Sequence, residues 1–268
     1  MALDFDQATG GRSGRSLGRS PGHVARHRRP RRRRWVVRLV AVTVTAVIAG
    51  GGFLLVLMAV TPSAAGAPSK VQAILAVHGA PGDAGHVPTK VGEALLATED
   101  SRFYSDWAID PNGTMRALWG LVTTNPNEGG ATIEVQLAKM LYTPRRSDPL
   151  ALAEQVAIAF KLDQDFSKTR ILAMYLDAAY FGDGAYGIAQ ASLHYFGVQP
   201  EQLTWGQAAL LAGLVQAPSR YDPHGHLRAA LIRRGEVLGR LVAVGTLTPS
   251  EVEAIDAEPL DPAVPFYG

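Results

Sequence analysis

The feature that most constrains this chain is an uncharged apolar run over residues 39–60. At about 1.5 Å per residue, a helix of this length crosses the roughly 30 Å hydrocarbon core of a membrane. A cleaved signal peptide and a buried core helix are the alternatives, but the run is longer than the apolar part of a usual signal peptide. The sequence therefore predicts a transmembrane helix over residues 35–60.

The residues around the start of this run are strongly basic. Residues 1–38 contain eleven arginines against Asp4 and Asp6, a net charge of +9, so the remainder carries −7 of the chain's total of +2. By the positive-inside rule, the four arginines at 31–34 predict an N-terminus in the cytoplasm and a C-terminal part outside it. Arginine runs also bind nucleic acid, but topology and anionic lipid headgroups account for this one, and no nucleic-acid partner is expected.

Composition divides the rest of the chain into a tail, a linker and one folded domain. Residues 1–34, rich in Gly, Ser and Arg, predict a disordered cytoplasmic tail. Small residues and prolines over 61–69 predict a linker, and residues 70–260 predict a single domain followed by a short tail at 261–268. The chain has no cysteine, which excludes disulfides, thiolate metal sites and thiol chemistry.

The domain is predicted to be mainly α-helical. Apolar residues recur at helical spacing in several segments, and no alternating strand pattern or internal repeat is evident. Capping residues mark helix starts at Ser167, Thr204 and Thr248, and Gly245 marks a helix end.

Two stretches combine groups that suit acid–base chemistry next to an anion. Glu99 and Asp100 follow an apolar helical segment, and Gly129 and Gly130 lead into a helical segment that carries Lys139. A carboxylate beside apolar groups suits proton transfer. A glycine loop that opens a helix suits an anion. The residues alone therefore predict an acid or base that faces an anion site.

Five ordered stretches resemble the peptidoglycan glycosyltransferase domain, which is the transglycosylase module of penicillin-binding proteins and of their monofunctional relatives. The matching residues are 99–104, 129–139, 161–163, 167–197 and 210–223. The resemblance implies a lysozyme-like helical fold at the outer face of the bacterial cytoplasmic membrane, where lipid II is polymerised into glycan strands with loss of undecaprenyl diphosphate. The Ser-x-x-Lys and Lys-Thr-Gly signatures of a transpeptidase are absent, so a monofunctional enzyme is expected.

The resemblance also implies roles for individual residues. Glu99 matches the general base that deprotonates the acceptor 4-hydroxyl as it attacks the donor's anomeric carbon. Lys139 would offset charge on the departing diphosphate. The expected substrate-binding residues are Asp100, Phe103, Thr132, Gln136, Lys139, Arg146 and Glu154. No cofactor is required, although a divalent cation such as Mg²⁺ at the diphosphate is left open. The implied partners are the membrane, lipid II, the nascent glycan strand, and a transpeptidase or other cell-wall synthesis protein.

The chain departs from the family pattern at a second glutamate. Counted back from Asp163, this position is Gln155, which cannot carry the negative charge of the glutamate. Glu154 is the alternative equivalent, because Arg146 precedes it at the spacing that the family shows. Gln155 shares a helical face with apolar residues, whereas Glu154 falls on the polar side. Gln155 is therefore the expected inward-facing catalytic group.

Other departures from the family pattern bear on two alternative functions. Ala131 replaces the usual serine of the glycine loop, and carboxylates at Glu134 and Asp106 would repel a diphosphate. These changes favour a degenerate relative that binds lipid-linked intermediates or envelope partners without polymerising them. A glycan hydrolase is a third possibility, ranked last because the long anchor and the helix that carries Lys139 suit a lipid diphosphate better.

Overall fold

The computed structural model describes residues 31–82, 85–106, 131–260 and 262–263. Residues 1–30 of the tail predicted over 1–34, the glycines at 129 and 130, and most of the tail at 261–268 lie outside the described residues. The chain divides into two compact units, Met1–Ala49 and Gly50–Gly268.

The apolar run forms helix α1 (Arg31–Val60). Its segment Trp35–Val60 has a mean hydropathy of 2.4 and is, within the described ranges, the one helix long and apolar enough to cross a membrane. This agrees with the predicted span. The helix begins earlier than residue 35, because arginine is a good helix former and extending a helix costs little once it is nucleated. Residues 31–34 therefore belong to the helix and not to a disordered tail.

The segment over residues 61–69, predicted to be a linker, is folded against the domain. A short 3-10 helix, η1 (Ala64–Gly66), leads directly into α2 (Ala67–His78), and the first alanine of each is fully buried. Lys161 Nζ donates to the carbonyl oxygen of Thr61 at 2.7 Å. The small side chains that suggested a flexible linker instead allow close packing.

The domain is built from helices, as predicted. Among the described residues there is no strand, only an isolated bridge between Tyr180 and Tyr186. The remaining elements are α3 (Thr89–Glu99), α5 (Ile133–Tyr142), α6 (Pro149–Asp165), α7 (Lys168–Ala178), α8 (Ile188–Phe196), η2 (Pro200–Gln202), α9 (Trp205–Leu214), α10 (Pro218–Tyr221), α11 (Pro223–Ala243) and α12 (Pro249–Ala257).

Local capping explains where several helices start and stop. Ser167 accepts a hydrogen bond from the backbone of Arg170 at the start of α7, and Thr204 and Thr248 form the predicted capping boxes of α9 and α12. Gly245, with φ of 83°, follows the end of α11 in the left-handed region. These predictions are confirmed.

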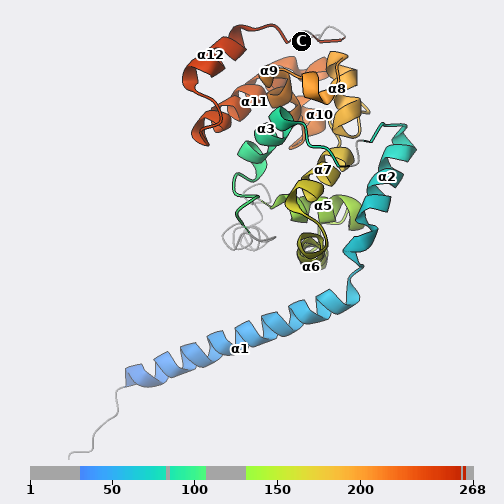
Figure 1. Cartoon of the computed structure of the whole chain (residues 1–268). Coiled ribbons are helices and arrows are strands. Elements are labelled where there is room, and N and C mark those ends of the chain that lie inside the picture. The colour runs from blue at the N-terminus through green and yellow to red at the C-terminus, as the bar shows by residue number, and fades with distance from the viewer. Residues whose placement is uncertain (1–30, 83–84, 107–130, 261, 264–268) are drawn as a thin grey trace, which may run out of the picture. The chain divides into compact units, whose positions relative to one another are not determined.

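Two sets of packed helices position the candidate site (Figure 1). Helix α5 packs against α6 and α7, and α3 packs against α9 and α11. The largest fully buried side chains include Phe103, Tyr175, Phe181 and Tyr195. The core therefore holds the end of α3 and the body of α5 in fixed positions.

Candidate functional site

Glu99, the predicted base, is the last residue of α3. Burial of Val91 and Leu95 fixes the helix, and the backbone leaves it at Asp100, whose φ is −157°. The Glu99 side chain is 14% exposed. Its Oε2 accepts a hydrogen bond from Gln136 Nε2 at 3.2 Å. The carboxylate is therefore largely shielded and held at one oxygen, while its remaining lone pairs can accept a proton.

Gln136 lies on α5 and orients Glu99. Besides the bond to Glu99, its Nε2 donates to the carbonyl oxygen of Ala131 at 3.0 Å. Its Oε1 accepts a hydrogen bond from the Tyr175 hydroxyl at 2.8 Å. Because an amide has only two N–H donors, both are used within the protein. Gln136 was predicted to bind substrate, but its donors are committed to positioning the carboxylate.

The Tyr175 hydroxyl provides a first test of this arrangement. The variant Tyr175→Phe leaves Gln136 Oε1 without its donor, so we expect the free energy of unfolding to fall by about 1–3 kcal/mol. Thermal unfolding of the full-length protein in detergent measures this loss. Tyr104→Phe is the matched control, since Tyr104 is 59% exposed. Equal losses in the two variants would contradict a specific role for the Tyr175 hydroxyl.

Asp100 and Thr132 both satisfy backbone groups at the first turn of α5. Asp100 Oδ2 accepts from the Ile133 backbone N–H at 3.3 Å, and Thr132 Oγ1 accepts from that of Val135 at 3.4 Å. Burial raises the pKa of the Asp100 carboxyl above its ordinary value. Phe103 is 2% exposed and presents almost no surface to a substrate. These three predicted substrate-binding residues support the junction between α3 and α5.

The two carboxylates that were expected to repel a diphosphate are both ion-paired. Glu134, only 1% exposed, lies 2.6 Å from Lys168 Nζ, which also contacts Asp163 at 2.9 Å. Burial raises the pKa of Glu134 despite the ammonium group beside it. Asp106 pairs with Arg102 at 3.2 Å. Each of the two carboxylates therefore has a basic partner, although Lys168 is shared with Asp163.

Lys139 is the candidate cation for an anionic leaving group. It lies three residues after Gln136 on α5, so the two side chains share one side of the helix. Its side chain is exposed, and within the described part of the chain it forms no ion pair. Its charge is therefore available to an external anion.

The second-glutamate region lies at the start of α6. Gln155 is buried, and its Nε2 donates to Thr143 Oγ1 at 2.8 Å. Glu154 is only partly buried and pairs with Arg146 at 2.8 Å, which also contacts Asp148. Gln155 therefore faces inward and Glu154 outward, as their helical positions predicted. Arg146 is engaged by two carboxylates, so its charge is less available to a phosphate than that of Lys139.

Arg233 on α11 is a site residue that the sequence analysis missed. Its Nη2 lies 3.8 Å from Glu99 Oε1, and its Nη1 pairs with Glu236 at 2.9 Å. The side chain is about 10% exposed. Arg233 falls on the buried side of α11, between Ala230 and Val237. An arginine on the apolar face of an amphipathic helix is the signal that could have identified it.

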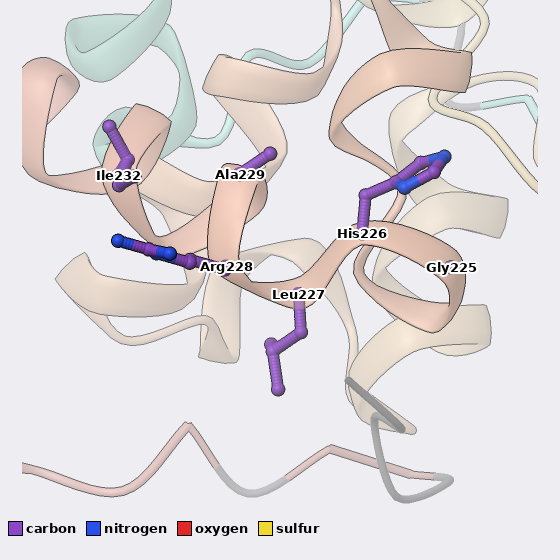
Figure 2. A pocket seen from close by; sticks show the side chains of 6 residues that line it. All are labelled: Gly225, His226, Leu227, Arg228, Ala229 and Ile232. Atoms are coloured by element: carbon purple, nitrogen blue, oxygen red, sulfur yellow. The ribbon is translucent and has the colours of Figure 1, made fainter.

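An open depression of about 400 Å³ lies on α11. It is lined by Gly225, His226, Leu227, Arg228, Ala229 and Ile232 (Figure 2). All six belong to α11, which is kinked at His226, and none is a predicted site residue. The candidate active site is therefore the set of contacts around Glu99.

Comparisons with known proteins agree on one family. The family model described as Transglycosylase matches residues 72–242. Penicillin-binding protein 1A of Vibrio cholerae is 36% identical over 66% of this chain and 22% of its own length. Penicillin-binding protein 1F of Bacillus subtilis is 38% identical over 62% of this chain and 23% of its own length. A candidate transglycosylase of Cupriavidus necator is 33% identical over 82% of this chain and 95% of its own length. The chain thus spans less than a quarter of each of these penicillin-binding proteins.

Proposed function

Because the chain belongs to the transglycosylase family, we propose that it is a peptidoglycan glycosyltransferase that polymerises lipid II and releases undecaprenyl diphosphate. The observation that carries this proposal is the shielded carboxylate of Glu99, which Gln136 and Arg233 hold beside the helix that bears Lys139. A positioned base next to an available cation is what displacement of a diphosphate requires.

In the proposed reaction, Glu99 takes the proton of the acceptor sugar's 4-hydroxyl while that oxygen attacks the anomeric carbon of the donor. The bond between the anomeric carbon and the diphosphate oxygen breaks, and the lipid diphosphate leaves with the electron pair. Lys139 stabilises the charge that develops on it. Gln136 and Arg233 act by keeping the Glu99 carboxylate in one orientation, so that it need not reorganise during the reaction.

The proposed enzyme is anchored in the cytoplasmic membrane by α1. The arginines before the span support an N-terminus in the cytoplasm and a catalytic domain on the outer side, where the lipid-linked substrate would be met. The contact between Lys161 and Thr61 joins the domain to the segment directly after α1. We include the nascent glycan strand as the second ligand and a transpeptidase as the partner that would process the product.

One observation favours the rival function, binding without turnover. The inward position that carries a glutamate in the family is Gln155, and its amide donates to Thr143. A neutral group there cannot offer the negative charge of a second carboxylate to a cation or to the substrate.

Polymerisation of labelled lipid II by the full-length protein in detergent separates the two functions. We expect glycan strands from the wild type, and a rate for Gln155→Glu within about tenfold of it, because the Thr143 hydroxyl, which accepts from Gln155, can instead donate to a carboxylate. Gln164→Glu is the matched control, because it makes the same change at an exposed position of α6. If Gln155→Glu formed glycan strands and the wild type formed none, the wild type would be a binding protein and not a polymerase. Repeating the assay with a chelator tests whether Mg²⁺ assists at the diphosphate.

A further inference from the structure

Three potential metal ligands converge, and none of them is among the described contacts of Glu99. They are Asp183, in the turn between α7 and α8, His194 on α8, and His224 near the start of α11. Asp183 Oδ2 lies 2.8 Å from His194 Nε2 and 3.1 Å from His224 Nδ1. One ligand atom from each residue lies within 4.8 Å of the others. Among the described residues, this is the one such group of histidine and acidic side chains.

Separate elements hold the three side chains in place. Asp183 sits between two glycines with positive φ, in a turn where the Tyr180 hydroxyl accepts a hydrogen bond from the Gly184 backbone. The His224 ring stacks on Tyr195 with 5.5 Å between ring centres, and the edge of His194 meets the same Tyr195 ring. Packing therefore brings the three side chains close together before any ion binds.

The spacing suits a single small ion. Two ligands bonded at about 2.1 Å to a tetrahedral ion lie about 3.4 Å apart. The Asp183 contacts of 2.8 and 3.1 Å are slightly shorter than this, and the two imidazole nitrogens lie within 4.8 Å of each other, so they would move closer on binding. Two neutral imidazole nitrogens with one carboxylate oxygen favour Zn²⁺ over Mg²⁺ or Ca²⁺, which prefer oxygen ligands. The side chains are partly exposed, so a water molecule can complete the coordination.

We propose that Asp183, His194 and His224 bind one Zn²⁺ ion that joins α8 to the start of α11. Beyond a kink at His226, α11 carries Arg233, which faces Glu99, so the ion would fix the first turn of α11, from which the segment that bears Arg233 continues. It takes no part in the proposed transfer, and the proposal stands independently of that reaction. In the metal-free state, the nitrogen of each imidazole that faces Asp183 carries the ring proton and donates it in a hydrogen bond. When Zn²⁺ binds, that proton moves to the other ring nitrogen, and the nitrogen that faces Asp183 offers its lone pair to the ion.

Titration with Zn²⁺ alone tests the site. The full-length protein in detergent is freed of metal with a chelator and titrated in competition with a chromophoric chelator. We expect one Zn²⁺ per chain at this site, and at least about tenfold weaker binding in His194→Gln and His224→Gln, since even loss of an outer partner of a metal ligand costs 10–100-fold. His226→Gln is the matched control, because His226 lies two residues away on α11 and lines the depression of Figure 2.

A second readout separates loss of metal from loss of fold. Zn²⁺ should raise the midpoint of thermal unfolding, Tm, of the wild type and of His226→Gln, but not that of His194→Gln. Asp183→Asn keeps a hydrogen-bond acceptor for both imidazoles and should fold normally, yet bind Zn²⁺ more weakly. Undiminished Zn²⁺ binding by the double variant His194→Gln/His224→Gln, or equal binding of Mg²⁺ by the wild type, would overturn the proposal.

Discussion

Replacing Glu99 by glutamine is expected to lower the rate of lipid II polymerisation by about 10²–10⁴-fold, because an amide cannot take the proton of the acceptor hydroxyl. Glutamine matches glutamate in shape and can still accept the hydrogen bond from Gln136, so the fold should be unchanged. Loss of an interaction made only in the transition state lowers kcat and kcat/KM together. Single-turnover and steady-state polymerisation rates measure both.

The control for this variant is Glu93→Gln, which makes the same change earlier on α3. Its rate should stay within about twofold of the wild type, because a change at the half-buried Glu93 leaves the described contacts of Glu99 in place. If Glu99→Gln polymerised as fast as Glu93→Gln, Glu99 would not be the base. If both variants lost activity together with their thermal transitions, the effect would be structural.

The helical organisation could be predicted because its causes are local. Thr204 and Thr248 cap their helices through groups only three residues away, so sequence spacing determines the contact. The apolar run of α1 is likewise a property of consecutive residues. The inward position of Gln155 follows from helical periodicity alone, and the structure agrees with it.

The tertiary contacts of the candidate site could not be predicted in the same way. Arg233 reaches Glu99 only because α11 packs on α3, and no local pattern encodes that pairing. The orientation of Gln136 depends on Tyr175, which belongs to another helix. The prediction of a linker over residues 61–69 was wrong for a related reason. Small residues permit flexibility and close packing equally, and the surface available for packing decides between them.

Replacing Lys168 by methionine is expected to destabilise the domain by about 3 kcal/mol at neutral pH, because breaking a buried ion pair leaves an uncompensated charge. Lys168 is the one basic partner described for Glu134, whose side chain is 1% exposed. For a domain of this size the loss corresponds to a fall in Tm of roughly 6–12 °C. Asp163→Asn, which removes the other, 27% exposed carboxylate, should cost less than about 1 kcal/mol.

The pH dependence of this loss distinguishes the buried charge from lost packing. Burial raises the pKa of Glu134 above its ordinary value of 4.5, so over a window above that value the folded protein keeps a proton that the unfolded chain has released. Stability therefore falls as pH rises through this window. Lys168→Met removes the ammonium group that lowers the pKa of Glu134, so this pKa rises further in the variant. The loss of stability relative to the wild type should therefore be smaller at pH 5 than at pH 7.5. The double variant Lys168→Met/Glu134→Gln should recover most of the Tm at both pH values. A deficit that is independent of pH and persists in the double variant would mean that Lys168 acts through its aliphatic packing instead.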